Sequence, residues 1–293
     1  MFVDGKELVI KGRFVKIAEL KEGWDEDIDD PEKFLGLLKR SKIKADIFTF
    51  MQRLPESKPK FKYHKEWDSI AAIPITTYDN WYKNQIHANP RNKIRVAEKK
   101  GVIVKVCEFN DELIKGITKI YNETPIRQNK YFHLVKMDFS KTRNAHITFL
   151  DRAIFIGAFF NKELIGFLKL VSTGKFMRTM GILTKVAYRD KAAMNLLVKK
   201  AVEICAENRI PYFVYGKYNY GNRGSDTLKE FKRHLGFESI ILPRYYCPLN
   251  AAGKMMIKLN FHHDFVDFIP NKMLHKSIEL RNHWHKKKYL RGN

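Results

Sequence analysis

The stretch Met180-Gly-Ile-Leu-Thr-Lys-Val-Ala-Tyr188, continued by residues 189–208 and Pro211 to Tyr215, decides the fold. Its first part is an apolar run with β-branched residues, which is typical of a buried strand. Residues 195–208 carry apolar side chains at helical spacing, so one face of this helix packs on a sheet. The second strand at Tyr212 follows a connection long enough for a parallel crossover. The start of such a helix offers free backbone N–H groups that can hold a phosphate.

Composition describes a chain with a sizeable core. The 293 residues are 44% hydrophobic and include 21 Phe, which excludes a disordered chain. No apolar run approaches the roughly 20 residues that span a bilayer. The first residues lack the basic and apolar blocks of a secretion signal, so we expect a cytoplasmic protein. Cys107, Cys205 and Cys247 are scattered and are expected to be reduced core thiols.

The formal net charge is +23. Such a field attracts polyanions, which include nucleic acids, anionic membranes and phosphate-rich cofactors or substrates. Charge alone does not choose among these partners.

Residues 1–76 predict a small, incomplete α+β half. Leu8 to Ile17 reads as a hairpin or a bent strand around Gly12, and a helix is expected from Pro31 to about Arg40. Two further strands are expected at residues 45–51 and 70–75.

Residues 77–250 predict a larger mixed α/β segment. A hairpin is expected at residues 153–171 with Asn161-Lys162 as its turn, and the Met180 run adds a third antiparallel strand. The other expected elements are helices through Trp81 and Ile86, at 91–100, 111–122 and 140–152, and a strand at 102–107.

This order of elements, with Asn161-Lys-Glu-Leu-Ile-Gly166 in the hairpin and His234-Leu-Gly-Phe237 after the last helix, resembles the GNAT acyltransferase fold. The segment Arg91-Asn-Lys-Ile-Arg95 through Val102 is similar to the basic helix of the Fem-type aminoacyltransferases, which share that fold. The resemblance implies a GNAT-like mixed sheet flanked by helices. It also implies an acyl-CoA, such as acetyl-CoA, as co-substrate, or an aminoacyl-tRNA in the Fem-like branch.

Two positions depart from the acyltransferase pattern. In the family a glycine-rich turn after the central strand holds the coenzyme A pyrophosphate, whereas this chain has Arg189-Asp-Lys-Ala192-Ala-Met194. Methyl and thioether groups crowd a backbone that glycine would leave open. Lys232 stands where many members carry the tyrosine that protonates the leaving thiolate. Both departures fit Fem-like relatives better than standard acetyltransferases.

Basic residues near the expected turn and on the preceding helix are candidates to bind the anionic carrier. Arg91, Arg95 and Lys99 are four residues apart and share one helix face, where they form a phosphate-gripping stripe or a solvated face without a ligand. A double charge reversal at Arg91 and Arg95 is expected to abolish activity without changing the melting temperature. Carrier-binding residues are expected at the turn and the following strand: Arg189, Lys191, Asn195 and Lys217.

The polar segment after residue 121 provides candidate catalytic groups. The resemblance implies that this loop lines the acceptor pocket. Glu123 or His133 is expected to take the proton of an amine acceptor, and Arg127 to hold an acidic or phosphorylated acceptor. The alternative is a capped loop with a hydrogen-bonded histidine.

A third group follows the strand at residues 212–215. Strand ends beside an open sheet bind ligands in such folds, so Tyr218 is a candidate general acid. Arg244 and Tyr245 are candidate substrate contacts. Tyrosines in strands are more often packing residues.

No metal site is predicted. His262-His263 and His283-x-His285 come closest, without matching carboxylates or cysteines nearby in the sequence. Residues 251–293 form a basic extension whose amphipathic part, from Pro270, can lie on an anionic membrane, bind RNA or pack on its own domain.

The sequence therefore predicts an acyltransferase acting on an amine or a sugar-nucleotide acceptor, with acyl-CoA as the favoured donor. Aminoacyl-tRNA is the alternative donor, and a basic nucleic-acid-binding module without catalysis is the contrasting hypothesis. The resemblance suggests cell-envelope or surface-polysaccharide synthesis as the setting. Donor, acceptor and oligomeric state are not fixed by the sequence.

Overall fold

A computed structural model describes residues 1–41, 43–127, 130–219 and 226–263, which form two compact units. The first unit contains residues 1–71, 217–219 and 239–263 of the described chain, and the second contains 72–216 and 226–238. The chain passes from the first to the second within strand β5, His64–Pro74.

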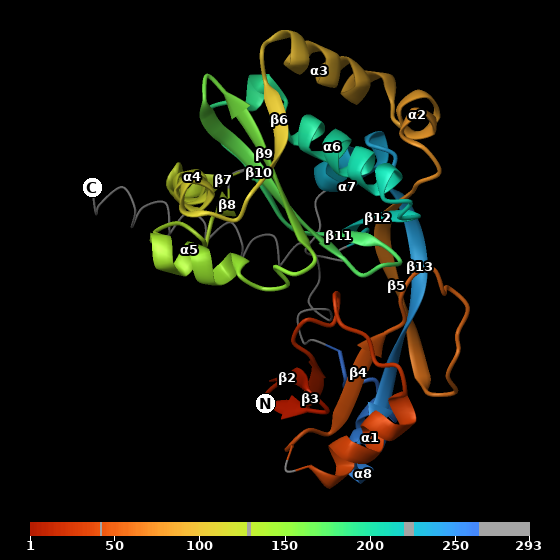
Figure 1. The fold of residues 1–293 in the computed structure, drawn as a ribbon. Coiled ribbons are helices and arrows are strands. Elements are labelled where there is room, and N and C mark those ends of the chain that lie inside the picture. The colour runs from red at the N-terminus through yellow and green to blue at the C-terminus, as the bar shows by residue number, and fades with distance from the viewer. Residues whose placement is uncertain (42, 128–129, 220–225, 264–293) are drawn as a thin grey trace. The chain divides into compact units, whose positions relative to one another are not determined.

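The first unit is built on strands in the order β1-β2-β3-β4-β13-β5 (Figure 1). The expected turn at Gly12 is confirmed, because this glycine has φ +91° between two antiparallel strands. The expected helix at Pro31 is also confirmed, with Asp30 capping its first turn. The elements are β1 Phe2–Val3, β2 Lys6–Lys11, β3 Ile17–Leu20, α1 Pro31–Arg40, β4 Ile47–Met51, β13 Glu238–Pro248 and α8 Ala251–Lys258.

A strand from near the carboxyl end completes the core of this unit. β13 pairs antiparallel with β4, placing Tyr245 opposite Phe50. Tyr245 and Cys247 are buried with Phe34 and Phe48 in one hydrophobic cluster. The N-terminal half looked incomplete in the sequence because its missing strand comes about two hundred residues later, within the segment assigned there to residues 77–250.

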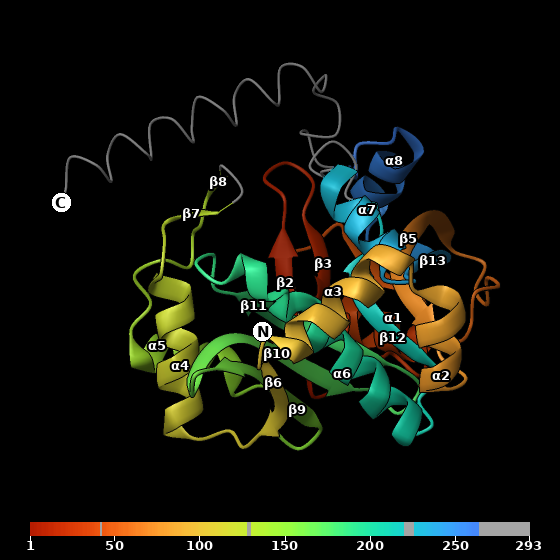
Figure 2. The same ribbon diagram turned by 90° about the horizontal axis from the view of Figure 1, so that it is seen from above.

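The second unit contains strands in the order β12-β11-β10-β9-β6. Helices α4 and α5 cover one face of β9 and β10, and α6 covers the other (Figures 1 and 2). Its strands are β6 Ile103–Cys107, β9 Ala153–Phe160, β10 Glu163–Ser172, β11 Met177–Thr184 and β12 Tyr212–Lys217, with a small hairpin of β7 Ile126–Arg127 and β8 Lys130–Tyr131. Its helices are α2 Tyr78–Asn80, a π-helical turn Trp81–Gln85, α3 Ala88–Lys99, α4 Asp111–Asn122, α5 Phe139–His146, α6 Ala193–Glu207 and α7 Asp226–His234.

Local chemistry explains where these elements turn or stop. The predicted hairpin is confirmed, and Asn161 and Lys162 both have positive φ (49° and 65°), as a tight two-residue turn requires. Helix α5 ends at His146 and not at 152, because the buried Lys169 ammonium binds the carbonyl oxygens of His146 (2.9 Å) and Thr148 (2.6 Å). A cation is a favourable partner for the free carbonyl groups at a helix end.

The two parallel strands of the second unit separate along their length. β11 pairs with β12 at Met177↔Phe213 and Arg178↔Val214, whereas β11 remains paired with β10 as far as Thr184. A β-bulge at Lys169/Leu170 interrupts the register of β10 with β11 near the point of divergence. The carboxyl end of β11 is therefore free of β12, in the position where open sheets bind ligands.

Two findings concern the membrane and the cysteines. Within the described residues, no helix combines the length and apolar character needed to cross a bilayer. All three cysteines are free, and burial raises the pKa of Cys205 and Cys247 to about 12. Cys205 and Cys247 are core thiols, as predicted, whereas Cys107 is only partly buried.

Candidate functional site

A pocket of about 270 Å³ lies at the amino end of α6, where β11 leaves its neighbour β12. Ala192, the residue before the helix, has left-handed backbone angles (φ +47°, ψ +33°) and provides no capping side chain. Glycine adopts this conformation more easily, yet the alanine takes it here. The N–H groups of Ala193 and Met194 therefore have no side-chain acceptor from the cap, whereas the N–H of Asn195 donates to the carbonyl of Ala192 (3.0 Å). The lining residues are Lys93, Thr184, Tyr188, Arg189, Asp190, Ala192, Ala193, Met194 and Asn195.

The polar lining of this pocket is positive and only partly compensated. Lys93 and Arg189 are exposed, and neither forms an ion pair with any carboxylate in the described part of the chain. Asp190 is occupied by Lys191 (3.2 Å) and Lys100 (3.8 Å). Asn195 is 8% exposed, and its side-chain amide makes no hydrogen bond to a described residue. Two cations and a buried amide are available to an anion at a helix amino end.

Lys191 points elsewhere than Arg189. Its ammonium lies 4.4 Å from the centroid of the Phe160 ring at the end of β9, and the side chain is 18% exposed. The residue therefore ties the turn to the sheet through a cation–π contact. Of the two basic turn residues, Arg189 is the one that faces solvent.

Glu123 and Arg127 fix the segment that leaves β11. The Glu123 carboxylate accepts the N–H groups of Val186 (2.6 Å) and Ala187 (2.8 Å), while the Arg127 guanidinium donates to the carbonyl of Thr184 (2.8 Å). Arg127 also donates to Glu123 itself (3.3 Å). Burial lowers the pKa of Arg127 from its usual value. Both residues are held in structural hydrogen bonds next to the pocket.

A second carboxylate holds the same segment from the hairpin. Glu163 accepts the Tyr188 hydroxyl (2.6 Å) and an ion pair from Lys185, and these hydrogen bonds lower the pKa of Glu163. The segment from Thr184 to Tyr188, which borders the pocket, is thus held by side chains from the end of α4, from β7 and from β10. Such a rigid support keeps a ligand site organised before binding.

The basic helix α3 lies beside α6 in both views (Figures 1 and 2). Arg91 donates to the carbonyl of Lys83 (3.2 Å) and Arg95 to the side chain of Asn92 (3.0 Å), so neither is neutralised by these bonds. The residue of this helix that lines the pocket is Lys93.

A separate basic cluster lies in the first unit around Asp68. This carboxylate pairs with Arg244 (2.6 Å) and Lys217 (3.1 Å). Burial opposes ionisation of Asp68, but the two cations hold its pKa below the usual value. Lys217 and Arg244, assigned from the sequence to carrier and substrate, are brought together by a carboxylate that the sequence did not indicate.

The remaining predicted residues are spread over the two units. Tyr218 follows β12, and its backbone N–H donates to the carbonyl of Ser69 (2.8 Å). Tyr245 is fully buried, and its hydroxyl donates to Gln52 (2.8 Å), an arrangement typical of a core residue. His133 is exposed beside Phe132, whose ring lies 4.9 Å from the Arg127 guanidinium.

Two buried basic groups were not assigned roles from the sequence. Lys232 is fully buried with its ammonium 5.0 Å from the Tyr215 ring, and burial lowers its pKa to about 8. The Nε2 atom of His146 lies 3.0 Å from the Tyr121 hydroxyl oxygen, and burial lowers the pKa of His146 to about 4. Neither residue lines the pocket at α6.

The sequence found the turn but missed two of the residues that define these clusters. Lys93 lies between the stripe residues Arg91 and Arg95, and only the packing of α3 on α6 selects it. Asp68 lies in β5, and its cationic partners are about 150 and 176 positions away in the sequence. Neither residue belongs to a local pattern.

Comparison with solved structures shows which proteins share this fold. FemX is similar with a TM-score of 0.57 and 11% identity, covering 81% of this chain and 83% of that one. The C-terminal domain of a putative lysylphosphatidylglycerol synthetase from Agrobacterium fabrum has a TM-score of 0.55 and 17% identity, covering 88% and 86%. L-PGS from Bacillus licheniformis has a TM-score of 0.52 and 14% identity, covering 87% and 85%.

The predicted GNAT-like fold is confirmed by this likeness. No family model matches the sequence, and no curated protein matches it. At these identities the likeness concerns the fold.

Proposed function

We propose that the protein is an acyltransferase that moves an aminoacyl group from a tRNA to an amine acceptor. The observation that carries this proposal is the pocket at the amino end of α6, with Lys93 and Arg189 unpaired by carboxylates in the described chain. An anionic carrier supplies the negative charge that this site lacks.

Three observations favour tRNA over a smaller carrier. Ala192, Ala193 and Met194 line the pocket, so side chains occupy space that glycines would leave for a pyrophosphate. The net charge of +23 and the basic stripe on α3 suit a long phosphate backbone. The name lysylphosphatidylglycerol synthetase, given to one protein of similar fold, refers to a lysyl group joined to a lipid, which supports transfer of an aminoacyl group.

The proposed reaction is direct transfer. The acceptor nitrogen attacks the carbonyl carbon of the aminoacyl ester, the bond from that carbon to the ribose oxygen breaks, and the tRNA leaves with its hydroxyl restored. The nitrogen loses one proton and the leaving oxygen gains one, so the step is balanced. Positioning of the two reactants supplies much of the rate.

Among the predicted proton acceptors, His133 is now the better candidate. Both oxygens of Glu123 already accept backbone N–H groups, whereas His133 is exposed next to the Arg127–Phe132 contact. Imidazole is the side chain that most often serves as a general base in enzymes. Tyr218 and Arg244 belong to the first unit, and their roles as acid and substrate contact stay predictions from the sequence.

Acyl-CoA is the second candidate donor. Ala192 adopts the left-handed conformation that a glycine turn would provide, and the amino end of α6 is open to a phosphate. For this candidate, the pyrophosphate of coenzyme A would have to reach the backbone of the turn past the methyl and thioether groups of Ala192, Ala193 and Met194.

Binding of the two carriers to the full chain separates the candidates. We expect tRNA to bind in a gel-shift titration with a dissociation constant that rises steeply with salt, and acetyl-CoA to give no heat in calorimetry. Micromolar binding of acetyl-CoA with no tRNA shift would reverse the order. If neither carrier binds but an unrelated RNA does, the result would support a basic nucleic-acid-binding module without catalysis. If nothing binds, the proposed carrier site is wrong.

A further inference from the structure

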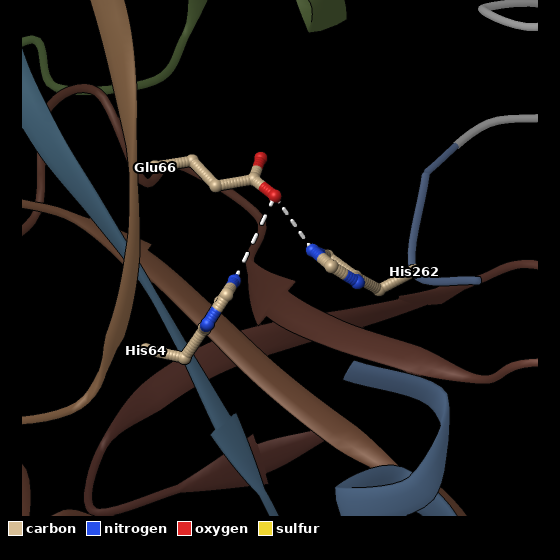
Figure 3. A group of neighbouring side chains, drawn as sticks. All are labelled: His64, Glu66 and His262. Carbon is tan, nitrogen blue, oxygen red and sulfur yellow. Dashed lines mark hydrogen bonds and ion pairs between the residues drawn. The ribbon is translucent and has the colours of Figure 1, made fainter. Parts of the chain in front are cut away.

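We propose that the first unit binds one divalent transition-metal ion of the zinc type, held by His64, Glu66, His262 and His263. His64 and Glu66 come from β5 and His262 from the segment after α8, and Figure 3 shows these three side chains. His263, the next residue after His262, reaches the same Glu66 carboxylate. This site lies within the first unit and does not depend on the proposed transferase activity.

Three imidazoles converge on one carboxylate oxygen. Nε2 of His262 lies 2.7 Å from Oε1 of Glu66, Nε2 of His263 lies 3.1 Å from the same atom, and Nε2 of His64 lies 3.8 Å from it. Figure 3 shows His64, from the same strand as Glu66, and His262, from the segment after α8, both pointing at the Glu66 carboxylate. One oxygen cannot accept three good hydrogen bonds, because it has about two lone pairs.

The spacing suits a small tetrahedral ion. Zinc bonds of about 2.0–2.2 Å to nitrogen and oxygen place neighbouring ligand atoms about 3.3 Å apart. The observed separations of 2.7, 3.1 and 3.8 Å bracket this value. The nearest ligand atoms of His64, Glu66 and His262 lie within 4.8 Å of one another, so modest side-chain shifts close the set. Three imidazoles and one carboxylate are a ligand set that zinc accepts readily.

The elements around the four side chains hold them in place and leave one side open to solvent, from which an ion can enter. His64 and Glu66 are two residues apart on a strand and project from the same face of β5. The His262 side chain is fully buried, with its ring 4.6 Å from that of Tyr246 in β13. The side chains of His64 and His263 are 41% and 33% exposed, so an ion can enter from their side. An ion here would join the segment after α8 to β5.

Zinc calorimetry on the chelator-treated full chain at pH 7.5 tests the proposal. We expect one site per chain with a dissociation constant in the micromolar range or below, and Co²⁺ at the same site should show the strong visible absorption of a tetrahedral complex. His64→Ala and Glu66→Gln should each weaken zinc at least tenfold. His64 is exposed and Glu66→Gln conserves shape, so both variants should fold, which circular dichroism checks.

The matched control is His87→Ala with His234→Ala. These two imidazoles also lie close together, with ring centroids 4.8 Å apart, but in the second unit. The control should bind zinc as the wild type does. His275, His283 and His285 are present in every variant, so any zinc they bind is common background. Absence of a site tighter than about 100 μM, or zinc binding that survives both His64→Ala and Glu66→Gln, overturns the proposal.

Discussion

The two basic clusters of this protein differ in how their charge is balanced. In the first unit Asp68 lies between Arg244 and Lys217, so the positive charge is neutralised within the fold. At the amino end of α6, Asp190 pairs with Lys191 and Lys100, while Lys93 and Arg189 have no carboxylate partner in the described chain. A count of lysines and arginines cannot separate a structural ion pair from an anion site, but their partners can.

The largest expected effect follows from reversing the uncompensated charges. Lys93→Glu with Arg189→Glu should weaken tRNA binding at least about 100-fold, because two charge-assisted contacts are replaced by repulsion. The melting temperature should stay nearly constant, since both side chains are exposed. Gel-shift titrations at several salt concentrations measure the loss and the change in salt slope.

A control with the same change in net charge isolates the site. Lys175 and Lys254 are exposed and line none of the pockets described above, so Lys175→Glu with Lys254→Glu should reduce binding only slightly. Equal losses in the two double variants would mean that the overall field, and not the pocket, binds the nucleic acid.

Removing the carboxylate of the cluster around Asp68 should lower the stability of the fold. Asp68→Asn leaves two partly buried cations without their anion and should lower the free energy of unfolding by about 2 kcal/mol, allowing for partial solvent screening. The folded-state pKa of Asp68 is lowered, so its contribution exists above the unfolded pKa and is lost as pH falls through the folded value. Urea denaturation should therefore show a deficit at pH 7 that shrinks towards pH 3. A deficit that does not change with pH would argue against the ion pairs as its source.

A charge reversal on the basic face of α3 should distinguish tRNA from acyl-CoA as the carrier. Arg91→Glu with Arg95→Glu should weaken tRNA about tenfold, since these residues line α3 outside the pocket and reach only an extended backbone. The same pair should leave any acetyl-CoA binding unchanged. Activity lost completely, as the sequence alone predicts, would place the stripe nearer to the reacting groups.

The fold could be predicted from sequence where the pattern is local. The turn at Asn161-Lys162 and the cap at Asp30 are encoded by the residues that form them. The closure of the first unit by Tyr245 and Cys247 depends on a pairing with no local signal. The end of α5 depends on Lys169, a lysine within an apolar strand whose burial at a helix end the pattern does not reveal.

The candidate site divides in the same way. Residues of the turn were found because a strand–turn–helix pattern marks them, and Arg189 and Asn195 do line the pocket. Lys93 and Asp68 were missed because their significance depends on which element packs beside them. Long-range packing and charge pairing are the physical information that a single sequence does not display.

The smallest expected effect concerns Lys232, whose charge is opposed by burial. Its pKa of about 8 means that the folded state favours the neutral amine, so protonation below that pH destabilises the fold and the penalty fades as pH approaches the usual value near 10.5. Lys232→Met should therefore raise the unfolding free energy by about 1 kcal/mol at pH 7, visible as a rise of roughly 2–4 °C in melting temperature. The gain should shrink at pH 9.5. Lys199→Met is the contrasting variant, because Lys199 is ion-paired to Glu98 (2.6 Å) and its removal should lower stability slightly. A Lys232→Met protein less stable than wild type at both pH values would show that the buried ammonium stabilises the fold despite its desolvation.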